Sequence, residues 1–315
     1  MVERIQATVN SFRQEWLQAS RRQPVMALAL WLGLATLVAL ALASLIPMVL
    51  SGSVQLAGQQ NLRHGFLGGM MGLAGTAAGA ALALSIRSVS AKTEDAMLGF
   101  AAGMMLAAAT FSLILPGLEH AATLTSQPML PAIVVVAGLF LGVFLMLGLD
   151  RFVPHYHDQV GECGVGCSRL SKVWLFVLAI AIHNLPEGMA IGVGFANGDW
   201  SAGFPLASAI AIQDIPEGLA VALTLRAVGL PLMRSVLVAA ATGLLEPIGA
   251  VIGWALTGGF QMAHPLGMGL AAGAMIFVVS HEVIPETHRR GHQTAATMGL
   301  MIGFAVMMFL DTALG

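Results

Sequence analysis

The sequence predicts an all-α fold, namely a polytopic membrane helix bundle of about nine transmembrane helices. Of the 315 residues, 57% are hydrophobic and 10% are charged, and the mean hydropathy is +0.84. Such values exclude a soluble globular protein. The 37 glycines are typical of closely packed membrane helices. The net charge is −2 and no basic cluster is present, so we expect no nucleic-acid partner.

Nine apolar stretches supply the predicted spans, because a helix needs roughly 20 apolar residues to cross a bilayer. The first stretch follows Arg21 and Arg22, as in a signal peptide, but it exceeds the usual signal length of about 7–15 apolar residues. We therefore expect an uncleaved helix in an N-terminal segment, residues 1–60, followed by an eight-helix core, residues 61–315. The nine stretches are approximately residues 24–50, 66–86, 96–118, 131–149, 173–195, 202–225, 231–256, 265–284 and 295–310.

The basic residues predict the orientation of the bundle. All 14 Lys and Arg except Arg63 fall before the first stretch or in loops on that same side. Because basic loops stay in the cytoplasm, we expect a cytoplasmic N-terminus and an external C-terminus. The longest internal loop, residues 153–171, would then be cytoplasmic. Its two histidines and two cysteines are compatible with a metal-collecting segment or with a polar linker, and two cysteines imply no disulfide framework.

The most informative motif occurs twice. Residues 183–188 read HNLPEG, and residues 213–218 read QDIPEG, thirty residues later. Each motif lies near the centre of an apolar stretch, so its side chains should lie near the membrane midplane. Each proline removes one amide donor, which predicts a kink in both helices. Irregular backbone at this depth is tolerated only where it faces protein or a polar cavity.

Helix geometry predicts that the polar residues of each motif act together. His183 and Glu187 share a face at i, i+4, and Asp214 shares one with Glu217 at i, i+3. Each ionised group costs about 2.5–3.5 kcal/mol at the bilayer centre, and no Lys or Arg lies in either apolar stretch. A divalent cation is the natural counter-charge, and imidazole with carboxylates suits zinc and its first-row neighbours. The alternative is a set of polar residues that only join helices.

Other polar residues extend this prediction. Glu246, beside Pro247, falls near the middle of the seventh stretch, and we expect it at the same site. Met105 offers a thioether in the third stretch, although ordinary packing accounts for most of the 19 methionines. Further histidines and acids near both membrane surfaces are expected to be mostly solvated, or to mark a route to a midplane site. They include Glu119, His120, Asp199, His264, His281, Glu282, Glu286, His288, His292 and Asp311.

A second internal repeat is weaker. Residues 101–105 read AAGMM and residues 271–275 read AAGAM, with a proline following each at Pro116 and Pro285. The predicted topology sends these two helices in opposite directions across the membrane. Paired segments of opposite direction indicate an inverted repeat, and the two proline motifs fit the same relation.

The two motifs, with Glu246 and the pair His281-Glu282, resemble the signature helices of the ZIP (Zrt-, Irt-like protein) family of metal transporters. The resemblance covers about residues 66–310 and leaves the first stretch as an addition to the eight-helix plan. It implies homodimers in a bacterial inner membrane that import divalent metal, chiefly Zn²⁺ with Cd²⁺ or Fe²⁺ as alternatives, by alternating access. It implies one metal site from His183, Glu187 and Glu217 with Gln213 and Met105 nearby, and an adjoining site from Asn184, Asp214 and Glu246 that shares Glu187 and Glu217.

Two other function classes fit the sequence less well. A membrane-embedded metal-dependent hydrolase needs an open metal position and an acid or base beside it. The motif HNLPE differs from the HExxH arrangement, and no dedicated general base is evident. A proton-coupled carrier of organic solutes would need an arginine or aromatic cluster at the midplane. We therefore expect a transporter with no catalytic cofactor, in which the metal is the substrate.

Overall fold

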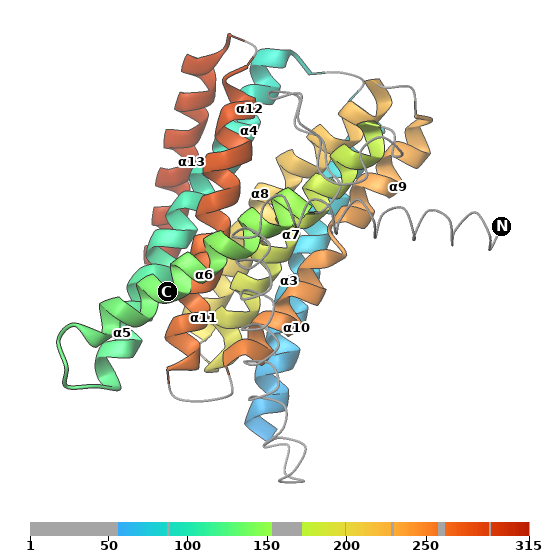
Figure 1. Ribbon diagram of the computed structural model, residues 1–315. Helices are drawn as coiled ribbons and strands as arrows, with labels where there is room; N and C mark the ends of the chain where they lie inside the picture. Colours follow the sequence, from blue (N-terminus) through green and yellow to red (C-terminus); the bar gives the residue numbers. More distant parts are fainter. Residues whose placement is uncertain are drawn as a thin grey trace.

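The computed structural model describes residues 56–86, 89–152, 172–198, 200–227, 230–257, 262–289 and 291–314. These residues form an all-helical bundle that contains no β-strand within the described ranges (Figure 1). Seven of its helices are long and apolar enough to cross a membrane, which confirms a multi-pass membrane fold. The helix α7, Lys172–Ala196, adds a further 25-residue element. The first predicted stretch, 24–50, lies outside the described residues.

The helices follow the predicted apolar stretches and extend beyond most of them. The first five long elements along the described chain are α3 (Leu56–Leu82), α4 (Ala91–Ala107), α6 (Leu130–Phe152), α7 and α8 (Trp200–Ala227). The last is α13 (Gln293–Leu314). The start of α4 has a local cause, because the hydroxyl of Ser90 accepts a hydrogen bond from the Thr93 amide at 3.1 Å. Such an N-cap satisfies one of the free amides at a helix start.

Two long helices each contain a π-helical segment, at matching positions. The helix α4 continues through a π-helical segment, η1 (Ala108–Ile114), into α5 (Leu115–Thr123). Similarly, α11 (Ala263–Val278) passes through η2 (Val279–Val283) into α12 (Ile284–Thr287). Pro116 and Pro285 each lie two residues after the end of a π segment. A proline ring clashes with the carbonyl four residues earlier, and a π segment gives that carbonyl a different position.

The seventh predicted stretch is divided, which differs from the single helix that its sequence predicted. The helix α9 (Leu232–Thr242) ends at the turn Gly243–Leu244, and α10 begins at Leu245 and ends at Thr257. Glu246 therefore lies in the first turn of α10 instead of in mid-helix. Unsatisfied backbone amides and the helix dipole favour a negative charge at this position.

Close glycine contacts join the helices in four pairs, which are α3 with α8, α7 with α10, α4 with α13 and α6 with α11. In the pair α4–α13, a Cβ on Gly103 would overlap the carbonyl oxygen of Leu300, and a Cβ on Gly303 would overlap that of Phe100. Small residues spaced four apart allow membrane helices to approach in this way. The spacing recurs at Gly99/Gly103, Gly299/Gly303, Gly188/Gly192, Gly249/Gly253, Gly138/Gly142, Gly269/Gly273 and Gly75/Gly79.

The pairs assemble into two groups of helices. One group contains α3, α7, α8, α9 and α10, which all contact one another or a shared neighbour. The other contains α4, α6, α11 and α13, with α4 and α13 side by side (Figure 1). The largest apolar cluster, which includes Met104, Leu113, Ile191, Leu206 and Met275, draws side chains from both groups. This apolar cluster therefore packs the two groups of helices against each other.

We predict that substituting Gly103 with alanine destabilises the protein, because the added methyl group must displace the α13 backbone. Overpacking of this kind costs roughly 1–3 kcal/mol. The midpoint of thermal unfolding of purified protein in detergent should fall by several degrees. Gly65→Ala is the control, because its nearest neighbour would lie 3.6 Å away, an ordinary contact. An equal midpoint for both variants would contradict the role of Gly103 in packing.

Candidate metal centre

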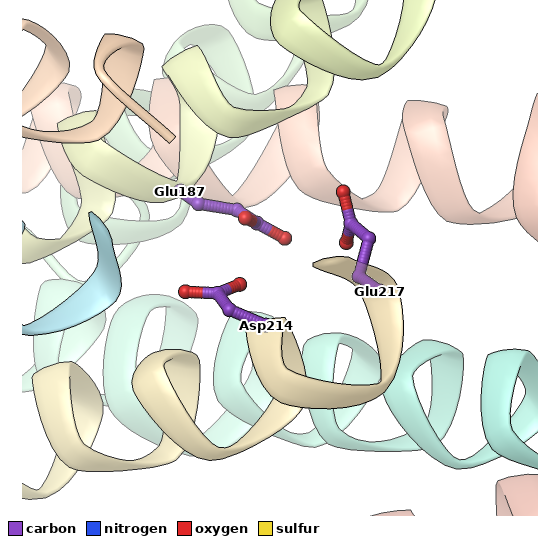
Figure 2. Close-up of side chains that lie close together, drawn as sticks. All are labelled: Glu187, Asp214 and Glu217. Atoms are coloured by element: carbon purple, nitrogen blue, oxygen red, sulfur yellow. The ribbon is translucent and has the colours of Figure 1, made fainter. Parts of the chain in front are cut away.

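Three carboxylates from the two sequence motifs meet between α7 and α8. Oxygen atoms of Glu187, Asp214 and Glu217 all lie within 4.8 Å of one another. Glu187 projects from α7, and the two other carboxylates project from neighbouring turns of α8, so that all three face a common space (Figure 2). Their exposed fractions are 0%, 1% and 9%, respectively. The predicted convergence of these three acids is thus present in the structure.

Two of these buried carboxylates have oxygen atoms without a hydrogen-bond donor. Gln213 donates to Oε1 of Glu187 at 2.6 Å. Within the described part of the chain, Oε2 of Glu187 and Oδ2 of Asp214 have no hydrogen-bond partner. Buried charge is costly unless it is paired or coordinates a metal. Because the surrounding helix sequence from Val173 to Leu225 contains no Lys or Arg, a cation is the counter-charge that the arrangement favours.

Glu246 reaches this region from the start of α10 and is fully buried. Its Oε1 atom accepts a hydrogen bond from the hydroxyl of Thr76 on α3 at 2.9 Å and a long one from the amide of Asn184 at 3.4 Å. Thr76 was not predicted from the sequence. The available signal was a hydroxyl group among the glycines and alanines of residues 72–80. Three helices therefore converge on one carboxylate.

The glycine that ends each motif explains how these neighbours come so close. A Cβ on Gly188 would overlap the backbone carbonyl of Glu246. A Cβ on Gly218 would overlap the backbone carbonyl of Thr76. Each motif thus supplies polar ligand-type side chains together with the glycine that admits an adjoining helix. This function of Gly188 and Gly218 depends on long-range packing and was not part of the sequence prediction.

His183 has a partner that the sequence analysis did not predict. Its Nε2 atom lies 2.7 Å from Oε2 of Glu282, which belongs to η2 in the other helix group. Glu282 belongs to the group of residues expected to be mostly solvated or to mark a route, and its side chain is only 13% exposed. His183 is not one of the three residues whose ligand atoms lie mutually within 4.8 Å. Its participation in metal binding remains a prediction.

Further polar pairs lie away from the carboxylates. On one side, His292 Nδ1 lies 2.9 Å from the buried Asp95 carboxylate. Towards the other ends of these helices, the hydroxyl of Ser112 donates to Asp311 at 2.5 Å. His264, 6% exposed, donates towards the Val193 carbonyl at 3.2 Å. The route through these groups remains a prediction.

Met105 and the predicted loop at residues 153–171 add no contact to this description. Met105 is 2% exposed and belongs to the largest apolar cluster, an environment that fits ordinary packing. A role as a soft ligand remains a prediction. The loop that contains His155, His157, Cys163 and Cys167 lies outside the described residues.

Comparison with known proteins decides the family. The profile described as "ZIP Zinc transporter" matches residues 153–311. The chain is 58% identical over 306 residues to "Zinc transporter ZIPB" of Bordetella bronchiseptica, which covers 96% of each chain. The chain belongs to the ZIP family. ZIP relatives also include "Zinc transporter GufA" of Myxococcus xanthus, 40% identical with 77% and 96% coverage, and human "Zinc transporter ZIP11", 29% identical with 82% and 100% coverage. These ZIP proteins are named as transporters, not as enzymes.

We predict that Zn²⁺ raises the midpoint of thermal unfolding of the purified protein, because a ligand that binds only the folded state stabilises it. At a free concentration of 100 times Kd the gain is about 2.7 kcal/mol. The variant Glu187→Gln, Asp214→Asn, Glu217→Gln should lose this rise. Without metal, the same variant should unfold at a higher temperature than wild type, because neutral amides remove the repulsion among three carboxylates. A metal-free variant less stable than wild type would indicate that the acids only join helices.

Proposed function

We propose that this protein transports divalent metal ions, with Zn²⁺ as the principal substrate and Cd²⁺ or Fe²⁺ as alternatives, across the membrane toward the cytoplasm. The observation that carries the proposal is the set of three buried carboxylates, Glu187, Asp214 and Glu217, on two adjacent membrane helices whose apolar stretches contain no Lys or Arg. The named zinc transporters among its relatives support the same substrate. The metal is cargo, and no catalytic cofactor is required.

The proposed binding region holds two ions. His183, Glu187 and Glu217 would form the primary position, with Gln213 and Met105 beside it. Asn184, Asp214 and Glu246 would form the adjoining position, with Glu187 and Glu217 shared between the two. Four carboxylates carry a formal charge of −4, which two divalent ions would cancel. Carboxylates bridge metal pairs about 3.5–4 Å apart in two-metal sites, and the short separations among Glu187, Asp214 and Glu217 support this geometry.

Alternating access would come from movement of one helix group against the other. All four acids belong to the group of α3, α7, α8, α9 and α10, so that the bound metal would move with this group. The contact between His183 and Glu282 crosses to the other group in the state described here. His183 and Glu282 would exchange this contact for other partners as the two helix groups move. Repeated packing supports an inverted repeat, since α4 and α11 share a π segment followed by a proline.

The remaining parts of the proposal concern architecture and location. We propose nine transmembrane helices, with an N-terminal segment at residues 1–60, an eight-helix core at residues 61–315 and a cytoplasmic loop at residues 153–171. The N-terminus would be cytoplasmic and the C-terminus external. Bacterial relatives support placement in an inner membrane. A homodimer is the proposed assembly, by analogy with the family.

We predict that His183→Ala, Glu187→Ala and Glu217→Ala each abolish saturable Zn²⁺ uptake into vesicles that contain purified protein. Each change removes one ligand from the primary position, and the remaining ligands are too few to hold the metal ion there. Glu286→Gln is the control, because Glu286 forms a partly exposed pair with Arg289 at 2.8 Å. Control vesicles should match wild type at equal protein content. Wild-type uptake by all three alanine variants would contradict the proposed site.

A further inference from the structure

The two carboxylate oxygens of Glu246 have different surroundings. Its Oε1 atom accepts the hydroxyl of Thr76 at 2.9 Å and lies 3.4 Å from the amide nitrogen of Asn184. Its Oε2 atom is buried and has no hydrogen-bond partner among the described residues. A carboxylate held through one oxygen while the other lacks a donor is arranged to bind a ligand through the second oxygen.

The unpartnered oxygen lies in a hollow that a glycine creates. A Cβ on Gly72 of α3 would overlap Oε2 of Glu246 and would lie 2.8 Å from its carboxyl carbon. The same Cβ position lies 3.2 Å from Oδ2 of Asp214, which also has no hydrogen-bond partner in the described residues. Two donor-free oxygens from α8 and α10 therefore meet beside Gly72. Any larger residue at position 72 would displace the Glu246 carboxylate from this place.

Thr76 determines which oxygen of Glu246 enters the hollow. Its hydroxyl has one proton and two nearby acceptors, Oε1 of Glu246 at 2.9 Å and the carbonyl of Gly72 at 3.4 Å. The carboxylate is the nearer acceptor, and hydrogen bonds to charged groups are the stronger kind. Thr76 is 1% exposed, and its backbone packs directly against Gly218. Its side chain consequently has little freedom to release Glu246.

We infer that Gly72 and Thr76 are positioning residues for the second metal ion, which they serve by directing Oε2 of Glu246 towards Asp214. This inference rests on the proposed transport function and assigns to α3 a part in metal binding. Gly72 provides the space, and Thr76 fixes the orientation. Groups that orient a metal ligand in this way typically change metal affinity about 10–100-fold when they are removed.

The first test compares Thr76→Val with Thr76→Ser in full-length protein in lipid nanodiscs. Valine keeps the shape of threonine but cannot donate, whereas serine keeps the hydroxyl. Cd²⁺ binding is measured by equilibrium dialysis with metal analysis over a concentration series. Wild type should bind two ions per chain. Thr76→Val should weaken the affinity for the second ion about 10–100-fold and leave the affinity for the first ion unchanged. Thr76→Ser should bind both ions as tightly as wild type.

The second test uses the space beside Gly72. Gly72→Ala should abolish binding of the second ion and lower the midpoint of thermal unfolding, because the new methyl group must displace the Glu246 carboxylate. Adding Glu246→Asp shortens the acid by one methylene and should recover most of the lost stability. Glu246→Asp alone serves as the control for the change of acid.

The outcomes separate this inference from the function on which it rests. Wild type that binds no Cd²⁺ would overturn both. Two ions in wild type and equally tight binding of both in Thr76→Val would overturn only the role of Thr76 and Gly72. If Thr76→Val weakened the affinity for both ions equally, or if Thr76→Ser bound the second ion as weakly as Thr76→Val, the defect would be a general structural one. Either result would also overturn the role of Thr76 and Gly72.

Discussion

Four carboxylates buried at the centre of an apolar helix bundle are the constraint on which the rest of this structure depends. Glu187, Asp214 and Glu246 are 0–1% exposed, and Glu217 is 9% exposed. No Lys or Arg occurs between Val173 and Leu225, so the apolar stretches that carry Glu187, Asp214 and Glu217 offer no ammonium or guanidinium group to neutralise them. Individually each charge would cost several kcal/mol at this depth. In the account proposed here, a divalent cation compensates several of these charges at once.

Glycine packing brings the acids together. Gly188 and Gly218, which end the two motifs, remove the side chains that would hold α10 and α3 away from α7 and α8. The same device joins the helices of the other group, where Gly103 and Gly303 allow α4 and α13 to touch. Helix approach in membranes relies on such van der Waals contact, since lipid offers little hydrophobic driving force. In the acidic region, close approach also determines which polar atoms can meet.

The sequence contained enough information to predict the helices and the acids, but not their neighbours. The long apolar stretches and the improbable charges at their centres are local signals, and they drew attention to Glu187, Asp214 and Glu217, whose carboxylates lie close together in the structure. Thr76, Gly72 and the pairing of Glu282 with His183 could not be predicted, because they arise from contacts between residues far apart in the chain. His183 and Glu282 are 99 residues apart, and Thr76 and Glu246 are 170 residues apart. The break before α10 was missed because Gly243 has no proline beside it to mark a turn.

Anomalous diffraction from crystals soaked in Cd²⁺ tests the central claim most directly, because it locates each metal ion without reference to transport. The account predicts two strong peaks about 3.5–4 Å apart among Glu187, Asp214, Glu217 and Glu246, with the second beside Gly72. Peaks confined to histidines near the membrane surfaces, with none among the four carboxylates at saturating metal, would contradict it.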